Sequence, residues 1–407
     1  MSRNRAPGAV SFPALVVFLL SGCGDRPPDG EPRDALWGDS LVLVEEMRLG
    51  GIEGDERHTF GYVAAIAPAP DGTFFVADAQ VPVIRRYSAD GEHLLDIGSR
   101  GEGPGEILGV QGMGVLPDDR LVVFDASNAR VTSWTLDGEF LESTMIPTGG
   151  SSFRGFVYGE NGRVFLSTVE IPSGPLAGGS DLQRHWSEVL PDGSVEVVHP
   201  MPATEPSEGP QYVLAGRGGY YRPFNTETLI TLGPDGALYQ VRNDEYRIRR
   251  TAEDGSTHEI VRDEPPVAVT GDERREWEVR SEGFAEQTPD ARDRYFPIPR
   301  TKPFIRELVT DPEGRLWVSR YTEATYMPYT EAEIEDREDL GLTATYNWRD
   351  LPTWDVFSPE GELLGVVHLP FKTTYSVAVG DHVWGIQSGD YREDWVVRWR
   401  IEPFEDP

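Results

Sequence analysis

The sequence predicts an all-β fold, a six-bladed β-propeller whose blades are four-stranded antiparallel sheets. Two observations predict it. Strand-length segments recur at a fixed offset, which is 47 residues both from Asp71 to Asp118 and from Asp90 to Asp137. The last copy of this repeat also lacks a strand that the start of the chain can supply. A β-sandwich, the alternative all-β fold, would not explain two turns that keep one offset.

Each copy of the repeat contains two tight turns between strand-length segments. Most of these turns read Asp-Gly, which favours hairpin connections between antiparallel strands. The many glycines (44) and prolines (33) of the chain agree with short strands joined by turns. The six copies lie within residues 66–98, 115–146, 160–198, 229–261, 308–368 and 376–401.

The sixth copy ends at 395–401 without a fourth strand, and the segment 40–49 belongs to no other copy. Pairing 41–49 with 395–401 would close the ring and leave the last blade without an open edge. We therefore expect the propeller to occupy 40–407, with its ring closed by an N-terminal strand.

The four strands of a blade, called a to d from the axis outward, place their connections at two ends of the ring. The a–b and c–d turns lie at one end, and the Asp-Gly turns all belong to this group. The long insertions belong to the other end, which we call the insertion face: 168–184 and 322–352 are b–c loops, and 199–222 and 263–302 link one blade to the next. Functional residues favour loops held on a rigid scaffold, so we expect the site on this face.

A small helical insertion is predicted before blade five, over residues 272–287. Trp277, Arg280 or Ser281, and Phe284 recur at helical spacing on one face. Asp272 is placed to act near the N-cap.

Aromatic and basic side chains gather in these insertions. Planar rings stack on sugars and flat ligands, and guanidinium groups bind oxyanions. We therefore expect the insertion face to bind a small anionic or sugar-like ligand, or a partner protein. The alternative is that the rings form a small core of the insertions and that the arginines pair with nearby carboxylates. The candidate ligand-binding residues, each expected to be partly exposed at the channel mouth, are Arg100, Tyr220, Tyr221, Arg222, Arg300, Lys302, Tyr346, Trp348 and Arg349.

The charge balance excludes one class of partner. The chain carries 37 basic and 69 acidic side chains, for a net charge of −32. A phosphate backbone needs a basic surface, so we expect no nucleic acid as partner. The acidic excess instead keeps the protein in solution, and we expect a monomer.

The N-terminus reads as an export signal. The apolar run 12–20 is shorter than the roughly 20 residues that span a bilayer. The residues Leu20-Ser21-Gly22-Cys23 after it resemble the lipobox of bacterial lipoproteins, and Cys23 is the only cysteine. The resemblance implies a signal peptide over 1–22, lipidation of Cys23, a tether over 23–39 and attachment to the cell envelope. Because Gly24, and not aspartate, follows the cysteine, we expect the outer membrane. The alternative is an ordinary cleaved signal.

Two segments resemble known propellers. Asp125, Asn128 and Arg130 match the motif of NHL-type blades, and the Gly-rich loop 98–106 is similar to a stretch of bacterial six-bladed propeller lipoproteins. The resemblance implies the fold and leaves the activity open. The loop lacks the Gly-Lys-Ser/Thr ending of a phosphate-binding loop.

No catalytic residue is assigned, and the sequence favours a binding protein over an enzyme. His93, His258 and His368 fall on predicted outermost strands and His382 at an a–b turn, so a three-histidine zinc site at the axis is not expected. Asp78 and Asp125 are expected to cap loops through backbone N–H groups. We expect no cofactor. The alternative function is a propeller hydrolase or lyase with a calcium ion in the channel, of the lactonase type.

Overall fold

The computed structural model describes residues 37, 41–52, 54–146, 155–170, 183–200, 212–215, 218–221, 223–287, 298–339 and 346–403. The chain divides into two compact units, Met1–Arg33 and Asp34–Pro407. The described residues all belong to the second unit. The predicted signal peptide and Cys23 lie outside them. No helix among the described residues is long and apolar enough to cross a membrane.

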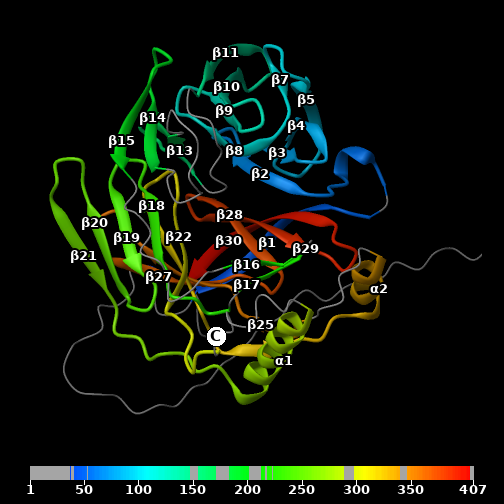
Figure 1. The fold of residues 1–407 in the computed structure, drawn as a ribbon. Helices are drawn as coiled ribbons and strands as arrows, with labels where there is room; N and C mark the ends of the chain where they lie inside the picture. Colours follow the sequence, from blue (N-terminus) through cyan, green and yellow to red (C-terminus); the bar gives the residue numbers. More distant parts are fainter. Residues whose placement is uncertain are drawn as a thin grey trace, which may run out of the picture. The chain divides into compact units, whose positions relative to one another are not determined.

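The fold is the predicted six-bladed β-propeller (Figure 1). Each blade is an antiparallel sheet of four strands, here given in the order a to d. Blade one contains β2 (Val63–Pro68), β3 (Phe74–Asp78), β4 (Val81–Tyr87) and β5 (His93–Ile97); blade two contains β8 (Val110–Val115), β9 (Arg120–Asp125), β10 (Arg130–Thr135) and β11 (Phe140–Met145); blade three contains β12 (Phe156–Tyr158), β13 (Val164–Glu170), β14 (Gln183–Val189) and β15 (Val195–Pro200).

The second half of the ring repeats this arrangement. Blade four contains β18 (Thr228–Leu232), β19 (Leu238–Arg242), β20 (Arg247–Thr251) and β21 (Thr257–Val261); blade five contains β22 (Ile305–Thr310), β23 (Leu316–Arg320), β26 (Thr353–Phe357) and β27 (Leu363–His368); blade six contains β28 (Thr373–Val379), β29 (His382–Ser388), β30 (Asp394–Pro403) and β1 (Leu41–Gly50). Smaller elements are η1 (Glu56–His58) and the pairs β6 (Ser99–Arg100) with β7 (Glu106–Ile107), β16 (Tyr212–Ala215) with β17 (Gly218–Tyr221) and β24 (Ala324–Tyr326) with β25 (Trp348–Asp350).

The ring is closed as predicted, because β1 is the outermost strand of blade six. It pairs with β30 along its length, from Leu41 opposite Pro403 to Gly50 opposite Trp395. Met47 and Leu49 of β1 are buried in an apolar cluster that also contains residues of blades one and six. The first and last parts of the propeller therefore share one core.

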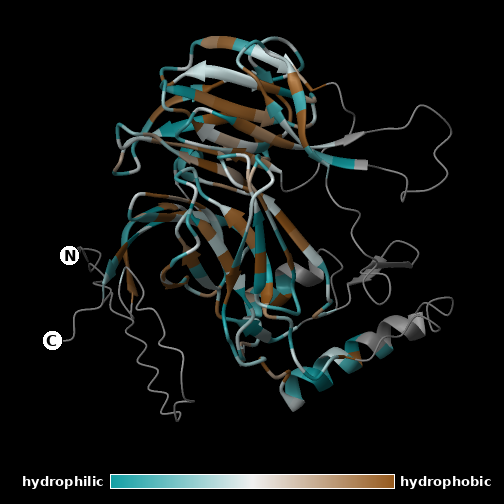
Figure 2. Ribbon diagram, turned by 90° about the vertical axis from the view of Figure 1, so that its left-hand side faces the viewer, coloured by the Kyte–Doolittle hydropathy of each residue, from teal (hydrophilic) through white to brown (hydrophobic). Residues whose placement is uncertain are grey.

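Apolar side chains fill the spaces between neighbouring blades. In Figure 2 the apolar residues lie mainly on the strands, and the described part of the helix after blade four is mostly hydrophilic. Small residues let the innermost strands approach one another. A Cβ added at Gly112 or Gly114 of β8 would lie 2.3 or 2.5 Å from the ring of Phe156 or Tyr158 of β12. Any larger residue there would separate blades two and three.

In the part of the chain that the structure describes, two α-helices interrupt the strands, and both belong to the insertion face. The predicted helix is α1 (Gly271–Gln287), between blades four and five. Its N-cap is Thr270 and not Asp272: the Thr270 hydroxyl accepts from the Glu273 N–H, and the Glu273 carboxylate accepts from the Thr270 N–H. This reciprocal pair is a capping box, which satisfies two N–H groups at once.

The second helix, α2 (Glu331–Asp339), was not predicted. It lies in the b–c insertion of blade five and begins with the same capping box, formed by Thr330 and Glu333. The Thr-x-x-Glu spacing is visible in the sequence, but the acidic run that follows it has almost no apolar periodicity.

Candidate functional site

A cleft of about 620 Å³ opens among the segments of the insertion face. Its walls come from α1, the b–c insertion of blade five, the link from blade five to blade six and the b–c loop of blade six. The aromatic residues that line it are Phe224, Trp277, Tyr321, Tyr329, Tyr346, Trp348 and Phe371, and the charged ones are Arg306, Glu333, Arg349, Asp350, Lys372, Asp390 and Arg392.

The aromatic walls are built by contacts between the insertions. The ring of Trp277 on α1 packs against Tyr346, with centroids 4.2 Å apart. Phe224 meets the edge of Trp277 at 6.2 Å and of Tyr321 at 5.8 Å. Trp348 of β25 packs against Tyr326, its cross-strand partner on β24. Flat apolar faces therefore come from three separate segments.

The charges of the cleft differ in sign from those of the whole chain. Four cationic side chains and three carboxylates line it, a local excess of one positive charge in a chain of net charge −32. The Lys372 ammonium lies 2.8 Å from Glu333 and 2.8 Å from Asp390. The Arg349 guanidinium lies 3.8 Å from the same oxygen of Glu333 and stacks over the Tyr329 ring.

These contacts keep the ion pairs charged. Burial alone would raise the pKa of Glu333, but the Lys372 ammonium, the Thr330 N–H and the Arg349 charge hold that pKa below its usual value. Burial opposes the charge of Lys372 as well, yet Asp390 and Glu333 raise the pKa of Lys372. Both groups are therefore ionised at neutral pH.

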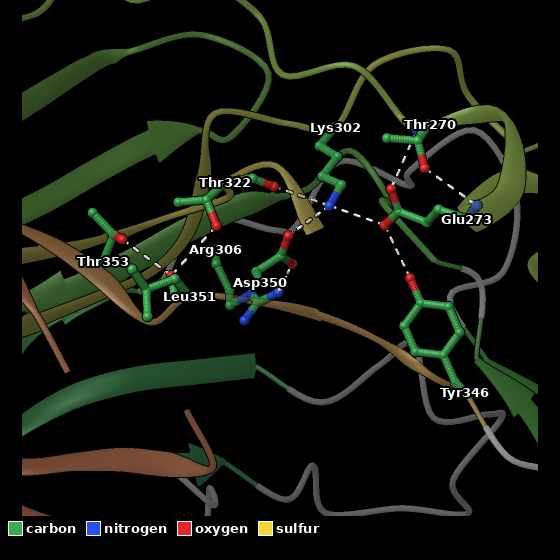
Figure 3. A network of polar contacts seen from close by, with 9 residues as sticks. All are labelled: Thr270, Glu273, Lys302, Arg306, Thr322, Tyr346, Asp350, Leu351 and Thr353. Carbon is green, nitrogen blue, oxygen red and sulfur yellow. Dashed lines mark hydrogen bonds and ion pairs between the residues drawn. The ribbon is translucent and has the colours of Figure 1, made fainter. Parts of the chain in front are cut away.

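Lys302 lies beneath the cleft at the centre of a polar network (Figure 3). Its ammonium donates to Asp350 at 2.5 Å and to the Thr322 carbonyl at 3.0 Å, and lies 2.9 Å from Glu273. The expectation that Lys302 is exposed is wrong, since its side chain is fully buried. Two carboxylates from α1 and β25 offset the cost of burying its charge.

Tyr346 joins this network to the cleft (Figure 3). Its hydroxyl donates to Glu273 at 2.9 Å, while its ring packs on Trp277. Burial, followed by the charge of Glu273, raises the pKa of Tyr346, so the phenol stays protonated and remains a donor. The buried network thus fixes the orientation of one aromatic wall.

The backbone around the cleft is strained. Phe224, Lys372 and Arg392 all line it and adopt positive φ angles of 54°, 63° and 62°. For residues with a side chain this conformation costs on the order of 1–3 kcal/mol, and it concentrates at functional sites. Asp119 and Ala129, the other described non-glycine residues with positive φ, lie outside the cleft.

The structure brings together three of the predicted site residues. Tyr346, Trp348 and Arg349 line the cleft. Arg100, in β6, and Arg300 are exposed and do not line it. Tyr220 and Tyr221 belong to β17, but their side chains, like Arg222, lie outside the described residues.

Sequence reasoning missed Lys372, Arg392, Glu333 and Arg306. Lys372 lies in the short link between β27 and β28, and Arg392 lies in the short loop between β29 and β30. Neither segment is a long insertion, so sequence length did not mark it as functional. Arg306 lies inside β22, and Glu333 belongs to the helix that was not predicted. The Thr330-x-x-Glu333 capping signature was the one signal that could have found Glu333.

The NHL-like residues have a structural role. Arg130 donates to the carbonyls of Glu102, Gly103 and Glu106, so the Gly-rich loop wraps around its guanidinium. Asp125 accepts from the N–H groups of the same link and from Asn128. Asp78 likewise accepts from backbone N–H groups at 61, 62 and 80. The expectation that the two aspartates cap loops is confirmed.

The described residues show no cluster of metal-ligating side chains. His93, His258 and His368 lie on the outermost strands β5, β21 and β27, as predicted. Within the described ranges, no group of three or more His, Cys, Asp or Glu side chains is placed to hold a metal. No residue is therefore assigned as a metal ligand.

The fold and the cleft define the chain as a six-bladed β-propeller with a ligand-sized, aromatic cleft on one face. Similar solved structures include a member of the DUF4221 family from Bacteroides vulgatus, with 12% identity, a TM-score of 0.50 and coverage of 90% of this chain and 99% of that one. A gluconolactonase from Xanthomonas campestris has 13% identity, a TM-score of 0.42 and coverage of 90% and 91%. Virginiamycin B lyase from Staphylococcus aureus has 12% identity, a TM-score of 0.39 and coverage of 88% and 98%. The likeness is one of fold. No protein-family model matches the sequence, and comparison with curated proteins finds no match.

Proposed function

We propose that this chain is a monomeric, lipid-anchored propeller of the cell envelope whose cleft binds a small ligand with a flat or sugar ring and an acidic group. One observation carries the proposal: an aromatic cleft with an excess of positive charge in a chain of net charge −32. A cleft of about 620 Å³ suits a ligand of a few rings.

The chemistry of the lining supports this ligand class. Trp348 and Tyr346 offer faces on which a sugar or a flat ring packs. Arg349 and Lys372 offer donors to an oxyanion, and Arg349 can present two parallel N–H groups. The local positive charge also attracts an anion to the cleft, whereas the remaining, negatively charged surface repels it.

Titration calorimetry with D-glucuronate as probe and D-glucose as its neutral counterpart tests the cleft. We expect the acid to bind more tightly than the neutral sugar. Trp348→Ala and Arg349→Ala should each weaken the acid about tenfold, because each removes about 1–2 kcal/mol of stacking or charge-assisted hydrogen bonding.

Arg300→Ala is the matched comparison, since Arg300 is an exposed arginine of the same face outside the cleft. Equal losses in Arg300→Ala and Arg349→Ala would move the site away from the cleft. Equal affinity for acid and neutral sugar would contradict the anionic ligand. One calcium ion retained through dialysis of the purified protein would instead favour the propeller hydrolase or lyase.

The proposed anchor is the lipid on Cys23. Cys23→Ala should move the full-length protein from the membrane fraction to the soluble fraction, because acyl chains contribute about 0.8 kcal/mol per buried CH₂. The measurement is fractionation together with incorporation of labelled fatty acid. Unchanged fractionation without incorporation would rule out the anchor.

A further inference from the structure

The carboxylate of Glu333 already occupies the positively charged part of the cleft. Its side chain is 11% exposed, and one oxygen, Oε1, lies 2.8 Å from Lys372 Nζ and 3.8 Å from the Arg349 guanidinium. The other oxygen, Oε2, accepts from the Thr330 N–H at 2.8 Å. One oxygen therefore caps α2, and the other faces the two cations that the proposed ligand requires.

One of the two cations, Arg349, is incompletely satisfied by the described residues. The Nε of Arg349 is buried and has no hydrogen-bond partner among the described residues. Lys372 is held from its other side by Asp390. Lys372 also adopts a positive φ of 63°, a strained backbone conformation that concentrates at functional sites.

We propose that Glu333 is a built-in substitute for the acidic group of the ligand, and that the ligand binds with a carboxylate between Lys372 and Arg349 after displacing Glu333 and the start of α2. This proposal rests on the proposed function of the cleft. It specifies the charge of the ligand, the two residues that bind this charge (Lys372 and Arg349) and a side chain of the protein that competes with the ligand (Glu333).

The group that Glu333 presents to the cations is itself a carboxylate, which favours a carboxylate over a phosphate as the ligand group. Without Glu333, Lys372, Arg349 and Asp390 together carry one positive charge, and Arg392 of the same cleft adds a second. Arg306 and Lys302 are balanced by Asp350 and Glu273, so they do not add to this count. A singly charged carboxylate restores the charge balance that the cleft has with Glu333 in place.

Displacement lowers the apparent affinity, because only the fraction of molecules in which Glu333 has left the cations can bind the ligand. If that fraction is about a tenth, removing the competitor raises the affinity about tenfold.

Glu333→Gln separates the competitor from the helix cap. Glutamine serves in a capping box as glutamate does and has the same size, so α2 keeps its cap while the ion pairs with Lys372 and Arg349 are lost. Glu335→Gln is the matched control, because Glu335 is exposed on the same helix and does not line the cleft. Both variants remove one negative charge.

Two measurements on the full chain test the proposal. Hydrogen exchange without any ligand should become faster for the α2 amides in Glu333→Gln and stay unchanged in Glu335→Gln. Titration calorimetry should give about tenfold tighter binding of D-glucuronate to Glu333→Gln than to the wild type, no gain for Glu335→Gln and a smaller gain for inorganic phosphate.

Four outcomes would overturn the proposal. Equal α2 exchange in all three proteins would show that Glu333 does not hold the helix. Equal binding of D-glucuronate by wild type and Glu333→Gln would remove the competition and leave the proposed function standing. Binding by neither protein would end both, and tighter binding of phosphate than of D-glucuronate would reverse the assigned charge.

Discussion

Deletion of residues 24–50 should unfold the propeller or lower its stability by more than 4 kcal/mol, whereas deletion of 24–36 should leave it unchanged. The longer deletion removes β1 and leaves β30 as an open edge. Burial of one large apolar side chain is worth about 1.5–3 kcal/mol, and β1 buries both Met47 and Leu49. Because a domain has only about 5–15 kcal/mol of net stability, the loss is a large share of it.

The shorter deletion is the control, since it removes no described residue. It also keeps Trp37, which lies in the range expected as a tether but donates its N–H to the Leu364 carbonyl and packs on blade five. Urea unfolding of both truncated proteins makes the comparison. Equal unfolding midpoints would contradict closure by β1 as a source of stability.

The ring and its closure could be predicted because turns that recur at one offset fix the number and order of the strands. Each turn fixes two strands, and a shared offset between Asp71 and Asp118 leaves little freedom in how the strands are counted. The predicted strand 41–49, which belongs to no other copy, can then pair only with the open edge of 395–401. The order of the strands within a blade also predicts that the long insertions lie on one face.

The details of the cleft could not be predicted in the same way, because they depend on contacts between insertions. Lys302 reads as an exposed lysine between prolines and polar residues, yet Asp350, 48 positions later, makes its burial acceptable. Lys372 and Arg392 enter the cleft through short connections whose left-handed backbone has no sequence signature in a lysine or arginine. Tyr346, Trp348 and Arg349 could be predicted as site residues because they belong to a long insertion that is rich in aromatic residues.

Lys302→Met should lower the free energy of unfolding by about 3–5 kcal/mol, because it leaves the buried carboxylate of Glu273 without its cation and that of Asp350 with only the exposed Arg306. The side chains of Glu273 and Asp350 are only 1% and 7% exposed. Methionine keeps the length of the side chain, so the loss reports charge and not a cavity. Arg306→Ala is the control: Arg306 pairs with the same Asp350 but is 41% exposed, so its loss should cost less than about 1 kcal/mol.

A triple variant decides whether unpaired charge is the cause. Adding Glu273→Gln and Asp350→Asn to Lys302→Met removes both carboxylate charges that Lys302 balanced, and we expect the stability to recover by several kcal/mol, since neutral groups cost far less to bury than ions that have lost their partner. Urea unfolding measures all four proteins. If the triple variant is no more stable than Lys302→Met, lost packing and not lost charge balance explains the effect. If Arg306→Ala is as destabilising as Lys302→Met, the burial of Lys302 does not increase its contribution to the free energy of unfolding. The aromatic wall of Trp277 and Tyr346 would then be held in place by contacts other than the Lys302 network.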